Sequence, residues 1–87
     1  MRAYLVELYV PRSRRARAFA LASRVRAVAE ELEREGRQIR YVRTMFLPDD
    51  ETCFQLVHAP SREAVGELCR CADPGHTRIV RVVEAQA

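Results

Sequence analysis

The sequence predicts an α+β domain with the element order β-α-β-β-α-β, and three observations lead to this prediction. At residues 47–54, a proline and two aspartates separate two runs that are rich in β-branched and aromatic residues, a pattern typical of a β-hairpin. Upstream, residues 14–35 carry apolar side chains at three- and four-residue spacing, which indicates an amphipathic helix. A strand-then-helix pattern therefore precedes the hairpin, and a helix-then-strand pattern follows it.

Length and composition limit the class of protein. A chain of 87 residues suits one domain, and a hydrophobic content of 48% argues against intrinsic disorder. No apolar run reaches the ~20 residues of a membrane span. The chain enters its first strand without the layout of a signal peptide, so we expect a cytoplasmic protein with no membrane partner.

The charged residues and cysteines exclude two further classes. The net charge is +3 and every basic residue is arginine, but acidic residues are spread along the whole chain. The aromatic residues form no evident platform for stacking bases, so we expect no nucleic-acid partner. Three cysteines are an odd number, which argues against an internal framework of disulfides.

The first strand is expected at residues 3–10, where apolar residues alternate with others. One face carries Tyr4, Val6, Leu8 and Val10, and the other carries Leu5, Glu7 and Tyr9. Pro11 ends this strand, and Ser13 is the expected N-cap of the helix that follows.

The first helix is expected at residues 14–35, with Gly36 as its stop signal. Its charges oppose the helix dipole: three arginines occupy residues 14–17 and four glutamates occupy residues 30–35, and each exposed misplacement costs roughly 0.3–1 kcal/mol at low salt. Two interpretations follow. Residues 13–17 form an anion site, or they belong to a solvated face that pairs such as Arg26–Glu30 partly relieve.

The second half of the chain completes the pattern. Strands are expected at residues 39–46 and 52–58, joined by a four- or five-residue acidic loop in which Glu51 can accept backbone N–H groups. A second helix is expected from residue 62 to about residue 70, with Ser61 as its N-cap. The run Asp73-Pro74-Gly75 breaks it, and a last strand at residues 77–84 precedes a short tail at residues 85–87.

This order predicts a single ferredoxin-like domain over residues 1–87: an antiparallel sheet of order 4-1-3-2 with both helices on one face. The open face is expected to display Leu5, Glu7, Tyr9, Tyr41, Arg43, Met45, Cys53, Gln55, Val57, Ile79, Arg81 and Val83. Its candidate interface residues are Glu7, Tyr9, Tyr41, Arg43, Cys53, Gln55 and Arg81. Because such a face is too apolar to stay in water, we expect a homodimer that packs sheet against sheet, with Glu7 and Arg81 pairing across neighbouring strands.

Several segments together resemble a known family. They are YLVE at 4–7, EG at 35–36, RY at 40–41, PDDETCF at 48–54, APS at 59–61 and RIV at 78–80. In these segments, which span nearly the whole chain, the sequence is similar to a family of small bacterial nickel-binding proteins. The resemblance implies a ferredoxin-like dimer that binds nickel, and it carries over no individual ligand.

Nickel prefers imidazole nitrogen, with carboxylate or thiolate as further ligands. The candidate ligands are Cys71, Asp73, His76, Cys69 and His58. Residues that are two positions apart in the sequence lie about 200° apart around a helix axis, so Cys69 and Cys71 cannot share one ion in a continuous helix. If the helix ends near residue 70, Cys71, Asp73 and His76 converge from an irregular loop. The alternative is that the cysteines are small apolar residues, that His58 packs against the helices and that His76 is solvated.

Catalytic motifs are absent from the sequence. There is no Gly-rich phosphate loop, nucleophile elbow or HExxH sequence, so we name no catalytic residue and expect a binding protein rather than an enzyme. The alternative function is binding or conversion of a small molecule in a cavity between sheet and helices. That alternative requires Glu7, Tyr9, Tyr41 or Arg43 to line the cavity.

Overall fold

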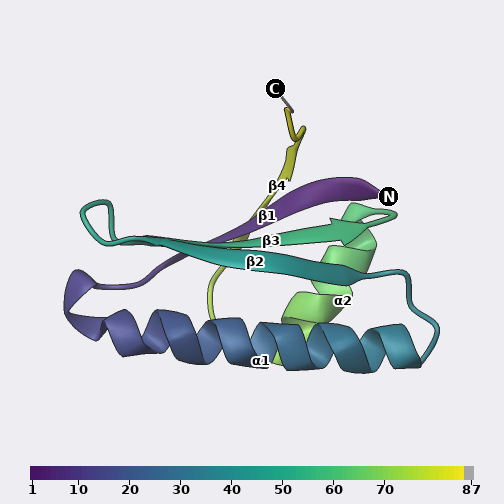
Figure 1. Ribbon diagram of the computed structural model, residues 1–87, viewed down its shortest axis with the longest axis horizontal. Coiled ribbons are helices and arrows are strands. Elements are labelled where there is room, and N and C mark those ends of the chain that lie inside the picture. Colours follow the sequence, from purple (N-terminus) through teal and green to yellow (C-terminus); the bar gives the residue numbers. More distant parts are fainter. Residues whose placement is uncertain (86–87) are drawn as a thin grey trace.

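The computed structural model describes residues 1–85 and contains one four-stranded antiparallel sheet with two α-helices on one face (Figure 1). The elements are β1 (Arg2–Tyr9), the 3-10 helix η1 (Arg12–Arg14), α1 (Arg15–Arg34), β2 (Arg40–Leu47), β3 (Thr52–Ala59), α2 (Arg62–Ala72) and β4 (Arg78–Val82). The strand order is β2-β3-β1-β4, which is the predicted order read from the opposite edge, so the ferredoxin-like plait is confirmed. Residues 86 and 87 of the expected tail lie outside the described range.

The helix ends differ in how they are capped. Ser13 is not the N-cap of α1, because the Pro11 carbonyl accepts the Arg14 N–H at 2.8 Å and closes the 3-10 turn first. The predicted cap of α2 is confirmed, since Ser61 Oγ accepts the Ala64 N–H at 3.3 Å. Gly36 has φ +92°, a conformation that suits glycine, and it follows the last turn of α1 as expected.

The core lies between the sheet and the helices. Tyr4, Val6, Leu8 and Val10 of the first strand region point into it and are all buried, as the alternation predicted. One buried cluster joins the centre of α1 to α2, and a smaller one lies under the first turns of α1. Among the described residues, neither helix is long and apolar enough to cross a membrane.

The pairing of β3 with β1 corrects the expected face of β3. Cys53, Gln55 and Val57 pair with Leu8, Val6 and Tyr4, so they lie on the helix-covered face and not on the open one. All three are completely buried. The alternation pattern could not show this, because β3 has apolar side chains on both of its faces.

A β-bulge corrects the expected face of β2. Tyr41 pairs with Val57 and Arg43 pairs with Leu56, so Val42 is an extra residue and the alternation changes phase there. Tyr41 therefore faces the helices, whereas Arg43 lies on the open face, as predicted.

The register of β4 corrects the last part of the expected open face. Ile79 and Arg81 pair with Val6 and Tyr4, which places both on the helix side of the sheet. Arg81 therefore does not pair with Glu7. Its expected place is taken by Arg78, which pairs with Glu7 along the strands and lies 3.7 Å from its carboxylate. Val83 lies beyond the end of β4.

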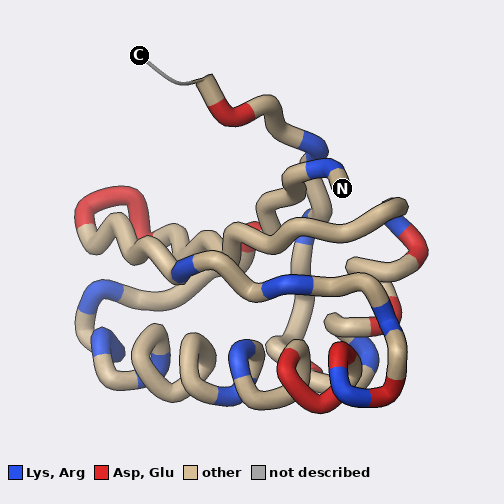
Figure 2. The backbone as a smooth tube through the Cα atoms, turned by 45° about the vertical axis from the view of Figure 1, so that its right-hand side comes forward, with Lys and Arg blue, Asp and Glu red and all other residues tan. Residues whose placement is uncertain are grey.

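Charged segments meet at one end of the molecule. The acidic loop between β2 and β3 lies beside the arginine-rich start of α1 (Figure 2), and Glu51 accepts the Arg12 backbone N–H at 2.9 Å. The loop closes through the Glu51 N–H and the Pro48 carbonyl at 3.2 Å, and Glu51 has φ +50°. Glu51 therefore joins the hairpin to the β1–α1 connection, close to the role that the sequence suggested for it.

Candidate functional site

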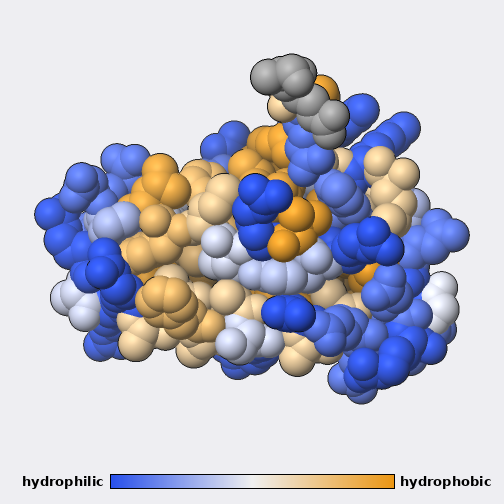
Figure 3. All heavy atoms as spheres, viewed as in Figure 1, coloured by the Kyte–Doolittle hydropathy of each residue, from blue (hydrophilic) through white to orange (hydrophobic). Residues whose placement is uncertain are grey.

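A cavity of about 390 Å³ lies between α1 and the second half of β2. It is lined by Arg15, Ala18, Phe19, Ala22, Tyr41, Thr44 and Phe46. Apolar side chains gather over this seam, where the start of α1 faces the end of β2 (left half of Figure 3). Phe19 is 69% exposed, which is unusual for a large apolar side chain and places an aromatic ring at the mouth of the cavity.

A chain of hydrogen bonds connects this cavity to the core. Gln55 is 0% exposed under the helices, and its carbonyl oxygen accepts a hydrogen bond from Thr44 Oγ1. The Thr44 hydroxyl lies 2.7 Å from the Tyr41 hydroxyl. On the other side, Gln55 Nε2 donates to Cys53 Sγ at 3.7 Å. The chain therefore begins at a buried thiol and ends at a tyrosine on the cavity wall.

The direction of the protons from Gln55 to Tyr41 follows from the carbonyl oxygen of Gln55. A carbonyl oxygen cannot donate, so Thr44 must use its one proton on Gln55. The Thr44 oxygen can then only accept, and Tyr41 must donate its one proton to it. The Tyr41 oxygen keeps its lone pairs, so the chain presents a hydrogen-bond acceptor at the cavity wall.

The buried thiol remains a neutral group in this chain. Burial raises the pKa of Cys53, because a thiolate is poorly solvated in the apolar cluster beneath α1. Cys53 therefore accepts a weak hydrogen bond and closes the chain rather than reacting. This is the small apolar role that the sequence left open for the cysteines, here combined with a hydrogen-bonding role.

Local structure explains how these groups come together. The bulge at Val42 puts Tyr41 on the helix side, and normal alternation after it also puts Thr44 and Phe46 there. The sequence identified Tyr41 as a candidate and included Arg15 in a possible anion site at residues 13–17, but it missed Thr44 and Phe19. One signal was available, since Phe19 is a large apolar residue next to, but not part of, the buried stripe of α1.

The candidate metal ligands of α2 do not converge. The helix continues to Ala72 instead of ending near residue 70, so Cys69 and Cys71 are both helical and point to different sides. Cys69 is half-buried, and burial raises its pKa although a hydrogen bond with Thr77 and the charge of Arg70 act in the opposite direction. The loop that would bring Cys71, Asp73 and His76 together required an earlier helix end, and within residues 1–85 the three side chains do not form a ligand group.

The two histidines lie at separate places. His58 pairs with Ala3 and Arg40, which puts it on the open face rather than against the helices, and its Nε2 lies 3.2 Å from Glu84 Oε1. His76 lies beside the start of α1, in a groove at the end of the sheet. Within residues 1–85, no three His, Cys, Asp or Glu side chains lie close enough together to hold one metal ion.

The remaining candidates are divided between two places. Glu7 and Tyr9 are on the open side of β1 as predicted, where both line the same groove as His76. Only Tyr41 lines the cavity between α1 and β2. Of the four residues that the sequence combined into one cavity, two line the groove, one lines the cavity and Arg43 lines neither.

Comparisons with known proteins assign no family to this chain. No family model, no curated protein and no solved structure matches it. The function must therefore be inferred from the geometry of the residues themselves.

Proposed function

We propose that this protein is a homodimeric binding protein that holds a small organic ligand in the cavity between α1 and β2. One observation carries the proposal: the hydrogen-bond chain from Gln55 through Thr44 ends at Tyr41 on the wall of a cavity with aromatic sides. Ligand sites typically have about 300–1,000 Å³, mostly apolar walls and a few oriented polar groups. A cavity of about 390 Å³ meets that description.

The cavity walls define the class of ligand. The Tyr41 oxygen accepts a hydrogen bond, so the ligand carries a hydroxyl or N–H donor. Phe19 and Phe46 provide apolar surface for a flat body, and the Arg15 guanidinium at the start of α1 suits a carboxylate. The ligand is thus a small organic acid with an apolar body and one hydrogen-bond donor.

The cost of burying glutamine supports a role beyond packing. A buried amide must regain in the protein the hydrogen bonds that it made with water, and an apolar side chain of similar shape avoids this requirement. Gln55 lies among Val6, Cys53 and Val57 on the helix-covered face, where apolar side chains at residues 44 and 55 together would avoid this requirement. Its retention is explained if the chain orients Tyr41 for a ligand.

The test begins with native mass spectrometry of freshly purified, untagged protein, which reports the subunit count and any bound mass together. Titration with 4-hydroxyphenylacetate and phenylacetate, followed by backbone amide NMR, then measures how much the ligand's hydroxyl donor contributes to the affinity. We expect the hydroxylated acid to bind roughly fivefold more tightly, the equivalent of one hydrogen bond of about 1 kcal/mol. Shifts should centre on the residues of the cavity.

Tyr41→Phe keeps the ring and removes the acceptor, so the preference for the hydroxylated acid should disappear. Tyr9→Phe makes the same chemical change at a residue outside the cavity and serves as the matched control. A preference that survives in Tyr41→Phe, or two acids that leave the cavity residues unshifted, would contradict the proposal.

The dimer is supported by the apolar character of the uncovered sheet face. Side chains from all four strands share this face, and they are Leu5, Met45, Phe54, Leu56, Val80 and Val82. These are not the residues that the sequence assigned to the face, but the physical argument is the same. Five of these side chains are partly exposed and Leu56 is buried beneath them, so packing two copies face to face would remove the exposed parts from water.

Nickel binding is a second candidate function, and one contact favours it. The imidazole of His58 and the carboxylate of Glu84 lie together on the open face, and both are ligand types that nickel accepts. A dimer through this face would supply two imidazoles and two carboxylates if its two-fold axis passes near His58. The ion would then bridge the subunits.

Calorimetric titration with nickel tests this second candidate. We expect about one ion per two subunits, with loss of binding in His58→Ala and retention in His76→Ala, which removes the imidazole that lies elsewhere. No heat above that of the buffer, or equal binding by the two variants, would end the nickel proposal and leave the cavity proposal unaffected.

A further inference from the structure

A second recess, distinct from the cavity of the proposed function, lies at the end of the sheet. It is a groove of about 410 Å³ between the end of β1, the β2–β3 loop, the first turns of α1 and the segment before β4. Six ionisable side chains of both signs line it, together with one aromatic ring. The ionisable residues are Glu7, Arg17, Asp50, Glu51, His76 and Arg78, and the ring is that of Tyr9.

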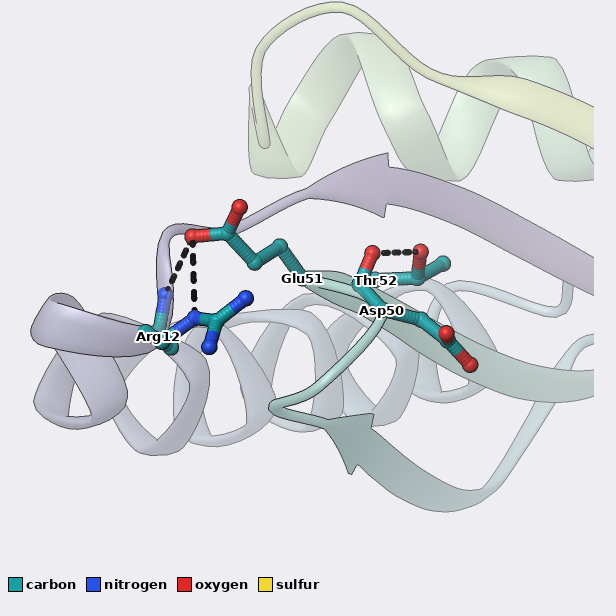
Figure 4. Close-up of polar contacts among 4 residues, drawn as sticks. All are labelled: Arg12, Asp50, Glu51 and Thr52. Atoms are coloured by element: carbon teal, nitrogen blue, oxygen red, sulfur yellow. Dashed lines mark hydrogen bonds and ion pairs between the residues drawn. The ribbon is translucent and has the colours of Figure 1, made fainter.

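Three carboxylates line the negative side of the groove, and arginines position two of them, Glu7 and Glu51. Glu7 and Glu51 have side chains that are only 28% and 30% exposed, and each is held by one arginine. Arg12 occupies one carboxylate oxygen of Glu51, and the other oxygen points away from Arg12 (Figure 4). The Glu7 carboxylate is 3.7 Å from Arg78, a long contact that leaves it acceptor capacity. Both carboxylates are therefore positioned by the protein and still able to accept.

Arg17 and His76 form the positive side. Arg17 Nη2 lies 3.6 Å from the position that a Cβ on Gly75 would take, so the guanidinium reaches from α1 to the segment between α2 and β4. None of the ion pairs within residues 1–85 involves Arg17. Arg17 lies in the first turns of α1, where its charge opposes the helix dipole, and within residues 1–85 no carboxylate forms an ion pair with it, although its side chain lines the groove.

We propose that this groove binds a small zwitterion, with its ammonium group at Glu7 and Glu51 and its carboxylate at Arg17. The two carboxylates accept the ammonium protons, and the exposed ring of Tyr9 offers a face for cation–π contact. The Arg17 guanidinium forms a bidentate contact with the carboxylate, and His76 lies beside it.

Ligands of a single charge fit the groove less well. A phosphate or other multivalent anion meets the two glutamates, whose negative charge repels it. A bare divalent cation meets Arg17 and Arg78, and no three ligands within the described residues are close enough to hold it. A molecule that separates one positive from one negative charge is complementary to both sides.

The test uses three zwitterions of increasing length, namely glycine, 4-aminobutanoate and 6-aminohexanoate. Butylamine and butanoate are the probes that carry only one charge. Binding is followed by the amide NMR shifts of the groove residues. We expect at least one zwitterion to bind roughly tenfold more tightly than either single-charge probe, because both charge-assisted contacts form at once.

Two variants assign the charges. Arg17→Ala should reduce the affinity for the zwitterion to that of butylamine and leave butylamine binding unchanged. Glu7→Gln should reduce the affinity for the zwitterion to that of butanoate and leave butanoate binding unchanged. Arg14→Ala removes the same charge from the same end of α1 at a residue outside the groove, so it should bind as the wild type does. Zwitterions that bind no better than single-charge probes overturn the proposal. If Arg14→Ala weakens binding as much as Arg17→Ala does, the proposal is also overturned, because the overall positive charge at the start of α1 would then explain the binding.

Discussion

The two faces of the sheet carry the opposite of what their surroundings favour. The face under the helices holds a glutamine that is 0% exposed and hydrogen-bonded within an otherwise apolar layer. The uncovered face carries apolar side chains such as Leu5, Phe54 and Leu56. A protein selected only for monomer stability would place these groups the other way round. This contrast is the basis of the two proposals, a ligand for the buried polar chain and a second copy of the protein for the uncovered apolar face.

The largest expected effect is a difference in alkylation rate between the cysteine of the covered face, Cys53, and a surface cysteine, Cys71. Cys53 is 0% exposed and burial raises its pKa, whereas Cys71 is exposed at the end of α2. Because Cys53 reacts only when the core opens, which costs roughly 5 kcal/mol or more in a stable domain, its alkylation should be at least about a thousandfold slower. Mass spectrometry after timed iodoacetamide labelling measures both rates.

The pH dependence sharpens this comparison. A raised pKa means that the Cys53 thiol stays protonated at pH values where an ordinary thiol has ionised, so moderate alkali should not expose it to reagent. Labelling in denaturant provides the control, since all three cysteines should then react. Rapid labelling of Cys53 in the native protein would show that the covered face is open.

The next largest effect is expected from a charge on the open face. Phe54→Asp places a carboxylate among the partly exposed apolar side chains that a partner copy would cover, and we expect the dimer to dissociate, with a loss of affinity of roughly a hundredfold or more. Light scattering after size exclusion measures this. Val83→Asp is the control, because Val83 is 86% exposed beyond the end of β4. A wild-type protein that is monomeric at micromolar concentration would contradict the proposed dimer.

A smaller effect is expected from cutting the buried chain. Gln55→Val leaves the Thr44 hydroxyl without its acceptor, and the loss should be about 1–3 kcal/mol in the free energy of unfolding. Adding Thr44→Val removes the orphaned hydroxyl and should restore part of that stability. Urea denaturation of the single and the double variant measures the stability that is lost and the part that is restored. Equal stability of the single and double variants would mean that the chain is not energetically coupled.

The smallest effect is expected at the surface of α1. Arg26 and Glu30 pair at 3.0 Å with both side chains at least half exposed, so Arg26→Ala should cost no more than about 0.5 kcal/mol. Thermal unfolding at low and high salt measures the difference. A larger loss would indicate that this exposed pair contributes to packing as well as to charge.

The errors of sequence-based prediction occur in strands where the alternation of apolar and polar residues does not distinguish the two faces. In β1 one face is fully apolar, and the alternation correctly assigned Tyr4, Val6 and Leu8 to the core. In β3 both faces are apolar, so the pattern could not tell which of Cys53 and Phe54 points inward. The site was harder to predict still, because Phe19 and Thr44 are separated in sequence and meet only when α1 packs on β2.

The sequence alone determined the elements, their order and hence the plait, because hydrophobic periodicity, turn residues and right-handed connections are local properties with few global solutions. Only the tertiary structure decided which side of each strand is covered. The bulge at Val42 and the pairing of β3 with β1 set that choice, and a shift of one residue reverses every side chain that follows. The buried chain that ends at Tyr41 and the groove beside Arg17 both depend on it.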